Sequence, residues 1–469
     1  MTASAEPGSG YDLSTGRPTT RLPARDLLRV SLYWLGLSSI FAGLGTVLAS
    51  RLVFDGLVAN QDEAGRTLAL LFIPGALIAI IVQPTIGSIS DYTASRWGRR
   101  KPYIFIGTIL DVIFLAGIAF SQEIIAIAAF IALLQFSSNF AQGPYQGYVP
   151  DLVPAPQVGL ASALVGMMQV FGNVTGFIVA GLALMTSRYD LALIALGLIE
   201  LLTMLSVVIH VRDSRPPRRR AGRSWRSVAA EAWGTDILRE RSFLWLIASR
   251  LAVLMAGGIL VNLALFYLAR SLGYSEDTSG VAVIFVVAMI ALATVVAVIP
   301  AARLSDRVGR KAVIYGSCVI GAIGLALVAL APALFTGPEL VPAAPSEDVP
   351  ALVGRLLDDA RFVIALVGVI LYGLSAGTFL AVDWALLTDI IPKASSGRYM
   401  GLSNVATASA GVLSLSLGGT LMDFVGGSNG PQAALWMGVA LFGVAIVLLR
   451  PVDERRRELK LLPDGAGST

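Results

Sequence analysis

Long apolar runs, each followed by a short polar segment, constrain this 469-residue chain more than any other feature. A helix needs about 20 apolar residues to cross the hydrocarbon core of a bilayer. Only 14% of the residues are charged, whereas soluble domains carry about 25%, so the excess apolar side chains must face lipid. The sequence therefore predicts an all-α membrane protein with twelve transmembrane helices. They are expected at 30–53, 67–88, 103–120, 124–148, 158–185, 189–211, 243–269, 279–301, 312–335, 361–388, 398–424 and 432–450.

The twelve expected spans form two groups of six, separated by a polar and basic segment. Most of the 35 Lys and Arg residues fall in segments on one side, and basic loops mark the cytoplasmic side. Both termini are therefore expected in the cytoplasm, and the basic run 215–226 is interpreted as a topology anchor that touches anionic lipid rather than nucleic acid. The predicted organisation is an N-terminal tail (1–29), a six-helix bundle (30–211), a cytoplasmic linker (212–242), a second six-helix bundle (243–450) and a C-terminal tail (451–469).

Two short patterns occur once in each half. Asp91 opens DYTASRWGRRK and Asp306 opens DRVGRK, each directly after the second span of its half. The segment YVPDLVP (148–154) has a counterpart in LLTDIIP (386–392), and each ends a fourth span. Matched loops in two six-helix halves are the pattern of a transporter built from parallel repeats, so two pseudo-symmetric bundles are predicted.

The segment 81–107 carries a known loop pattern. Its residues IVQPTIGSISDYTASRWGRRKPYIFIG contain G-x-x-x-D-x-x-G-R-R/K, lengthened by TASR, and this resembles the major facilitator superfamily. The longer pattern, with QGP at 142–144 and DL at 151–152, is similar to plant sucrose transporters and animal solute carrier family 45. The resemblance implies the major facilitator fold and sucrose/proton symport.

The chain departs from that family in its fourth span. The family has an acidic residue and an arginine there, where this chain has Gln135 and Gln146. If the family's pair couples protons to sugar, this chain needs another titrating group. The fifth span lacks the Gly-Pro motif of drug/proton antiporters, which disfavours export.

Four amides in the fourth span share one helical face, because they are spaced at i, i+4, i+7 and i+11. Amides facing lipid would lack hydrogen-bond partners, so this face must meet protein or water. Interhelical hydrogen bonding is one interpretation, and a substrate-binding stripe suited to hydroxyl groups is the preferred one. The four residues are Gln135, Asn139, Gln142 and Gln146.

The tenth span offers a second candidate face, with Tyr372, Ser375 and Phe379 as substrate-binding residues, although such rings also suit a packed core. Asp383 follows on the same face. It lies at a depth similar to that of Arg250 in the seventh span, and the resemblance places both spans beside the cavity. We expect these two residues to pair, either as a static ion pair or as the proton-coupling site.

Two further acidic residues, Asp111 and Glu200, lie within the third and sixth spans. The resemblance places these spans at the periphery of the bundle, so a structural role is expected for both.

The repeated loops are expected to act as gates. In the superfamily the loop aspartate meets the start of the eleventh helix and the basic residues hold the halves together, while the alternative is a topology anchor only. A glycine permits the tight turn. The predicted gating residues are Asp91, Arg96, Gly98, Arg99 and Arg100 in the first half and Asp306, Arg307, Gly309 and Arg310 in the second.

These features predict a secondary active transporter, not an enzyme, in the plasma membrane. It would move a small polar solute, such as a sugar or glycoside, by alternating access with proton coupling. The open alternatives are an efflux transporter of amphipathic compounds and a non-transporting sensor on the same fold. A single histidine and a single cysteine argue against a metal site, and no nucleotide-binding GxxxxGK[ST] loop occurs. We expect a small-molecule substrate, a proton and the bilayer as partners, and a monomer without cofactor or nucleic acid.

Overall fold

The computed structural model describes residues 18–57, 63–154, 157–211, 224–225, 240–335, 349–390 and 396–453. Nearly all of these residues are helical, and they divide into two compact units. The first unit comprises Met1–Arg51 and Pro74–Trp233, and the second comprises Leu52–Ile73 and Gly234–Thr469. The boundary at residue 233 falls inside the predicted linker 212–242, most of which lies outside the described residues.

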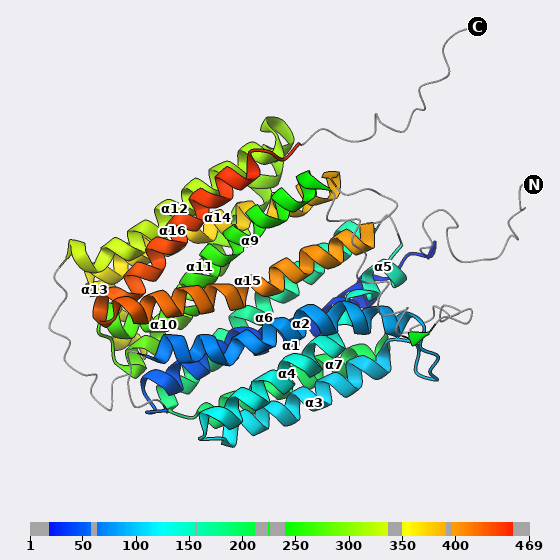
Figure 1. Cartoon of the computed structure of the whole chain (residues 1–469), viewed down its shortest axis with the longest axis horizontal. Helices are drawn as coiled ribbons and strands as arrows, with labels where there is room; N and C mark the ends of the chain where they lie inside the picture. The colour runs from blue at the N-terminus through cyan, green and yellow to red at the C-terminus, as the bar shows by residue number, and fades with distance from the viewer. Residues whose placement is uncertain are drawn as a thin grey trace, which may run out of the picture. The chain divides into compact units, whose positions relative to one another are not determined.

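The helices of the first unit follow the expected spans closely (Figure 1). The fourth span ends earlier than predicted, because Gly147 separates it from a short helix that contains Asp151. The helices are α1 (Ala24–Val53), α2 (Ala64–Asp91), α3 (Lys101–Phe120), α4 (Ile124–Gln146), α5 (Tyr148–Leu152), α6 (Val158–Thr186) and α7 (Tyr189–His210), and α2 up to Ile73 belongs to the second unit.

The second unit differs from the prediction at its first span. The helix expected over 243–269 breaks at Leu263 and continues through a short helix and a π-helical turn, Tyr267–Ser271. A short amphipathic helix, α13, precedes the tenth span and was not predicted. The helices are α9 (Arg241–Asn262), α10 (Ala264–Phe266), α11 (Glu276–Val308), α12 (Arg310–Leu334), α13 (Val349–Asp358), α14 (Ala360–Ile390), α15 (Ser396–Val425) and α16 (Gly430–Leu449).

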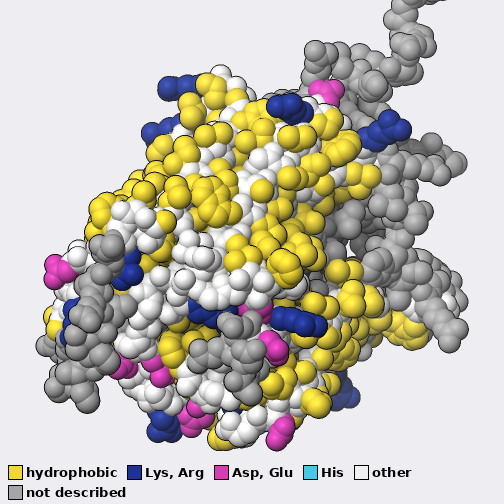
Figure 2. Space-filling model, turned by 60° about the vertical axis from the view of Figure 1, so that its left-hand side comes forward, with side chains coloured by type: hydrophobic (Ala, Val, Ile, Leu, Met, Phe, Trp, Pro, Cys, Tyr) yellow, Lys and Arg dark blue, Asp and Glu magenta, His cyan; other side chains and the backbone are white. Residues whose placement is uncertain are grey.

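Eleven helices within the described residues are long and apolar enough to cross a membrane. The remaining expected span, 398–424, lies within α15, where Ser409–Val425 forms a shorter apolar helix. Many large apolar side chains on these helices are exposed, including Ile125, Phe120 and Phe424. Figure 2 shows hydrophobic side chains spread over broad areas of one face. This surface suits lipid, because water would not stabilise so much exposed apolar area.

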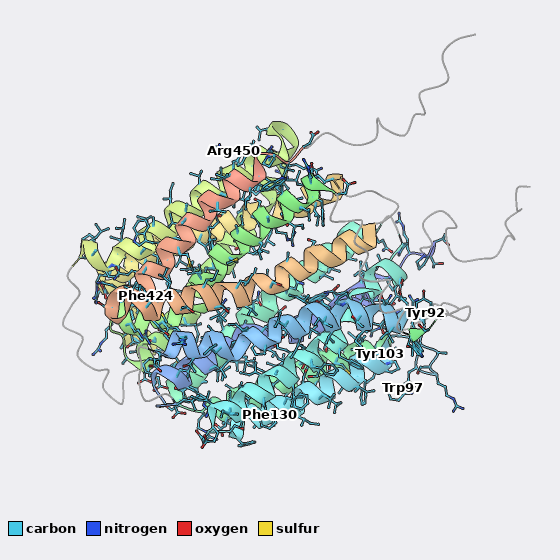
Figure 3. All side chains as sticks on the ribbon, in the orientation of Figure 1. Tyr92, Trp97, Tyr103, Phe130, Phe424 and Arg450 are labelled. Carbon is cyan, nitrogen blue, oxygen red and sulfur yellow. The ribbon has the colours of Figure 1, made fainter. Side chains whose placement is uncertain are left out.

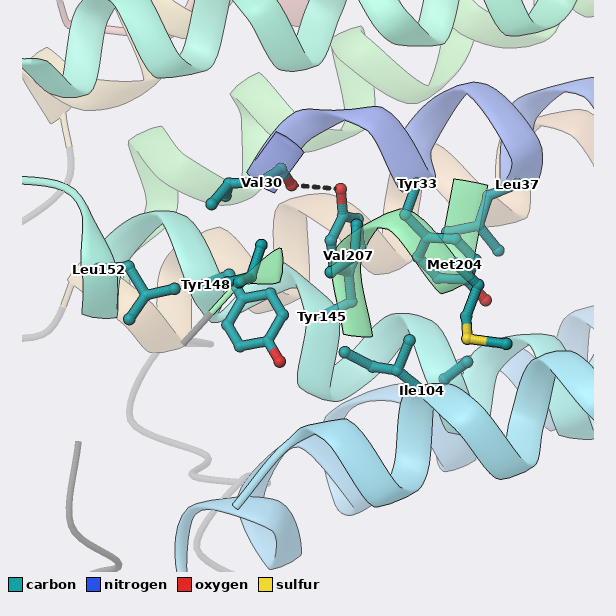
Figure 4. Close-up of a cluster of buried hydrophobic side chains, with 11 residues drawn as sticks. Val30, Tyr33, Leu37, Ile104, Tyr145, Tyr148, Leu152, Met204 and Val207 are labelled. Atoms are coloured by element: carbon teal, nitrogen blue, oxygen red, sulfur yellow. Dashed lines mark hydrogen bonds between the residues drawn. The ribbon is translucent and has the colours of Figure 1, made fainter. Parts of the chain in front are cut away.

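The core of the first unit joins α1, α3, α4 and α7 around a group of tyrosines (Figure 4). The ring of Tyr145 packs edge-on against Tyr33 at 4.9 Å, and its hydroxyl donates to the Val30 carbonyl at 2.5 Å. A buried tyrosine needs such a partner for its hydroxyl. These contacts fix the first helix against the fourth.

Aromatic residues gather at one end of the first unit, where α2 ends and α3 begins. Figure 3 shows Tyr92, Trp97 and Tyr103 there. The Tyr103 hydroxyl lies 2.7 Å from that of Thr93, and Trp97 packs edge-on against Phe105. Exposed amphipathic rings of this kind are usual at a membrane–water interface.

Candidate functional site

A buried ion pair joins three helices of the second unit. The guanidinium of Arg250 on α9 donates to Asp383 Oδ2 on α14. It also donates to the hydroxyl of Thr407 on α15, at 3.3 Å from Nε and 3.1 Å from Nη2. The side chains of Arg250 and Asp383 are only 5% and 2% exposed. The structure thus brings together the two residues that were expected to pair from their similar depth and from the resemblance.

The second carboxylate oxygen of Asp383 is unsatisfied. Oδ1 is buried and has no hydrogen-bond partner among the described residues. A buried carboxylate oxygen without a donor is costly. This oxygen is the atom of the pair that a proton could bind.

The other candidates on α14 point to different neighbours. The ring of Tyr372 packs on Gly257 of α9, on the side of Arg250. The hydroxyl of Ser375 instead donates to the Ser317 carbonyl of α12 at 2.6 Å, and Phe379 is buried. The three predicted residues therefore do not form one open face, and Ser375 serves the packing of α12 on α14.

The amides of α4 are brought together in part. Asn139 Nδ2 donates to the Gln135 carbonyl at 2.7 Å and to its side-chain Oε1 at 3.3 Å. Gln135 also packs on Gly75 of α2, where any side chain would collide with it. Gln142 and Gln146 are only partly buried. The stripe therefore divides into a packed pair and a more accessible pair.

The loop between α2 and α3 carries a network of two acids and two arginines. Asp91 lies 3.5 Å from Arg99 and 3.0 Å from Arg100, and both arginines also pair with Asp151 of α5. Arg100 further donates to the Pro144 carbonyl at 2.6 Å. The network ties the loop to the end of α4.

Two other residues of this loop, Gly98 and Arg96, were also predicted to act in gating. Gly98 has a φ of 101°, which only glycine adopts without strain, as the sequence predicted. Arg96 is exposed. Sequence reasoning did not assign a role to Asp151, although the repeated YVPDLVP and LLTDIIP segments contained the signal.

The loop of the second unit repeats part of this arrangement. Gly309 has a φ of 93°, and Arg307 is exposed while Arg310 is partly buried. The side chain of Asp306 lies outside the described residues, so its predicted gating contact stays a prediction.

One lysine after each loop caps the last helix of its own unit. Lys101 Nζ donates to the Val208 carbonyl near the end of α7 at 2.6 Å. Lys311 Nζ donates to the carbonyls of Arg450 and Val452, after α16, at 2.7 and 2.8 Å. A cation is stabilised at a helix C-terminus by the exposed carbonyls and the macrodipole. The internal repeat therefore extends from the sequence to side-chain contacts.

A pocket in the second unit is lined almost wholly by apolar side chains of α9, α14 and their neighbours. Its one hydroxyl, of Tyr267, already donates to the Val328 carbonyl at 2.8 Å. The pocket contains none of the predicted substrate residues, and it offers a hydroxylated solute few partners. The lining comprises Ile259, Leu260, Leu263, Ala264, Tyr267, Leu268, Val286, Val328, Phe362, Ala365, Leu366, Val369, Pro431 and Leu435.

Comparisons with known proteins agree with the loop pattern. The family model described as Major Facilitator Superfamily matches residues 30–346. Sucrose transport protein SUT1 of Oryza sativa subsp. japonica is 27% identical over 168 residues, which cover 27% of this chain and 31% of that protein. The general alpha-glucoside permease of Schizosaccharomyces pombe is 30% identical over 159 residues, covering 30% of this chain and 29% of the permease.

A mammalian protein is also similar to part of this chain. Solute carrier family 45 member 4 of Mus musculus is 29% identical over 121 residues, covering 23% of this chain and 15% of the relative. The chain thus matches less than a third of the length of these curated relatives.

The solved structures match over nearly the whole chain. A D-xylose-proton symporter has a TM-score of 0.63 at 16% identity, covering 90% of this chain and 95% of the symporter. A bacterial homolog of the human lysosomal transporter Spinster has a TM-score of 0.67 at 14% identity, covering 92% and 97% of the two chains. At these identities the structures show a common fold. The resemblance drawn from residues 81–107 and 142–152 is confirmed.

Proposed function

Because the chain belongs to the Major Facilitator Superfamily, whose members are transporters and not enzymes, we propose that it moves a small polar solute by alternating access. The solute is a sugar or glycoside, and transport is coupled to protons. The proposed topology has twelve spans, with α15 as the eleventh, and both termini in the cytoplasm. The proposed location is the plasma membrane.

The sugar assignment rests on the relatives and on the amides of α4. The curated relatives include sucrose transport proteins and an alpha-glucoside permease. Gln142 and Gln146 are partly buried on a membrane helix, and their amides can both donate to and accept from hydroxyl groups. Tyr372 provides a ring on the side of α14 that faces α9. These groups supply the chemistry that a hydroxylated ring requires.

The coupling assignment rests on one observation, the buried Arg250–Asp383 pair with its unsatisfied Asp383 Oδ1. While the guanidinium stays in contact, it stabilises the carboxylate. A rearrangement that separates the two would leave a charge in a poorly solvated site, and binding a proton would neutralise it. The pair can therefore exchange an arginine contact for a proton, which is the step that a proton-coupled transporter needs.

The test is sugar uptake by Asp383→Asn protein in liposomes with an imposed pH gradient, with and without a protonophore. We expect gradient-driven accumulation to be abolished while substrate exchange persists, because the amide cannot take the transported proton. Asp190→Asn, which changes a partly exposed acid that pairs with Arg188 at the start of α7, is the matched control and should accumulate substrate normally. Full accumulation by Asp383→Asn would remove this residue from coupling. A wild-type protein that transports sugar but ignores the gradient would refute proton coupling itself.

A further inference from the structure

Two acidic side chains meet in the interior of the first unit. Asp111 of α3 and Glu200 of α7 are both completely buried. Asp111 Oδ1 accepts a hydrogen bond from the Ser137 hydroxyl of α4. Glu200 Oε1 accepts one from the Tyr33 hydroxyl of α1 at 2.9 Å. Each carboxyl group thus has one oxygen occupied by a hydroxyl donor.

The second oxygen of each carboxyl group lacks a hydrogen-bond donor among the described residues. These two atoms, Asp111 Oδ2 and Glu200 Oε2, are buried. The two carboxyl groups nonetheless lie within hydrogen-bonding reach of each other. Carboxylate oxygens only accept hydrogen bonds. Two of them can bond to each other only when one carries a proton.

An additional hydroxyl faces the same place. Ser138 on α4 is completely buried and lies beside Asp111, and its Oγ has no hydrogen-bond partner in the part of the chain that the structure describes. Ser137 and Tyr33 already point at the pair. Two carboxyl oxygens and one hydroxyl of this site therefore have no hydrogen-bond partner among the described residues.

No basic side chain neutralises the pair among the described residues. The charged and hydrogen-bonding neighbours of the Asp111 carboxyl are Glu200, Ser137 and Ser138. Those of the Glu200 carboxyl are Tyr33 and Asp111. Among the described residues, Tyr33 of α1 is the titratable side chain of a packed helix that contacts the pair. Its hydroxyl also lies 2.5 Å from that of Thr108, and its ring contacts that of Tyr145 on α4.

Tight packing encloses the pair. Gly36 of α1 lies directly against the backbone of Glu200, and Gly107 of α3 lies directly against α4 at Ser137. A side chain at either glycine would collide with these neighbours. Two unneutralised negative charges in such a place would be very unfavourable.

We propose that Asp111 and Glu200 bind one proton between them and form a proton site in the first unit, separate from the Arg250–Asp383 pair. One proton from water adds to one carboxylate oxygen and donates a hydrogen bond to the other carboxylate. Both bare oxygens are then satisfied by a single ligand. The proposed proton binding at this site does not depend on which solute is transported.

The test is infrared spectroscopy of the purified protein at neutral pH, in ordinary and in heavy water. The wild type should show the carbonyl band of a protonated carboxylic acid, shifted by deuterium. Glu200→Gln and Asp111→Asn each carry the same charge as the singly protonated pair, and their amides supply the missing donor. Each variant should therefore fold normally and lose that band, whereas Asp383→Asn should retain it.

Thermal stability gives a second readout. Wild-type stability should fall as the pH rises above about 4, the pKa of an unfolded carboxyl group, until the shared proton leaves, because the folded pair keeps a proton that the unfolded chain has released. This fall should be absent from Glu200→Gln. The proposal is overturned if both amide variants keep the full infrared band. It is equally overturned if sodium, compared with choline at the same ionic strength, abolishes the band, because the oxygens would then hold a metal cation instead.

Discussion

The interiors of the two units each contain buried carboxyl groups, and they stabilise them differently. In the second unit Asp383 lies against the guanidinium of Arg250. In the first unit Asp111 and Glu200 have hydroxyl partners and each other, with no basic partner among the described residues. An ion pair can be opened by moving the cation away. A pair of acids has no cation to lose, so in the proposed site a bound proton adjusts its charge.

The largest expected effect comes from removing the cation. Arg250→Ala leaves the Asp383 carboxylate buried without its main partner, which typically costs about 3–5 kcal/mol of unfolding free energy. The double variant Arg250→Ala/Asp383→Asn removes the stranded charge and should recover most of that loss. Denaturant unfolding of both proteins in detergent measures the difference. Equal losses in the single and double variants would show that the arginine acts through packing alone.

The next effect concerns Asp91, which is partly exposed and belongs to a network of four charges. Asp91→Asn should leave insertion intact, since Asp151 still pairs with Arg99 and Arg100. Transport should fall roughly tenfold or more, because a charge-assisted hydrogen bond contributes about 1.5–3 kcal/mol. Proteoliposome uptake checks this. Wild-type uptake by Asp91→Asn would mean that the loop is only a topology signal.

A smaller effect tests polar groups without charge. Gln142→Ala should weaken solute binding by about 0.5–1.5 kcal/mol for each neutral hydrogen bond lost. Gln135→Ala is the matched comparison, because that amide is already engaged with Asn139. It should alter stability more than affinity. A titration with unchanged affinity in both Gln142→Ala and Asn139→Ala would remove this stripe from the binding site.

The sequence predicted elements far better than side-chain partners. Apolar runs of membrane length located the helices, because lipid imposes both their length and their composition. The early end of α4 and the break near Leu263 were missed. Around Leu263 the chain stays largely apolar, so hydropathy carries no signal of the break. At the end of α4 the signal was Gly147, a residue that commonly ends helices.

Partners across helices were predicted unevenly. Arg250 and Asp383 could be matched because both are charged and lie at one depth. The contact of Asp111 with Glu200 could not, because periodicity does not show which faces of α3 and α7 meet. Ser375 was assigned to the substrate face by its spacing, yet it donates to α12. Spacing gives a face of a helix and leaves open which neighbour covers it.

The smallest expected effect comes from a third kind of carboxylate, at the start of α14. Asp359 accepts hydrogen bonds from Arg361 at 2.8 Å and from the Tyr274 hydroxyl at 2.8 Å. Burial alone would favour the protonated acid, but these hydrogen bonds outweigh it and lower the pKa of Asp359. Burial, with the neighbouring carboxylate, raises the pKa of Tyr274, so its hydroxyl remains a donor.

A lowered pKa in the folded state fixes the sign of the pH dependence. The stabilisation by Asp359 is complete above the unfolded pKa of about 3.9 and is lost as the pH falls through the lower folded value. Asp359→Asn should remove about 1 kcal/mol at neutral pH, because the amide oxygen can still accept a hydrogen bond from Tyr274 or Arg361 although the side chain is buried. It should also flatten the acid limb of thermal stability, whereas Glu200→Gln should remove the fall in stability that the wild type shows as the pH rises above about 4. Identical pH profiles for the two variants would contradict the distinction between a carboxylate held by a cation and one held by a proton.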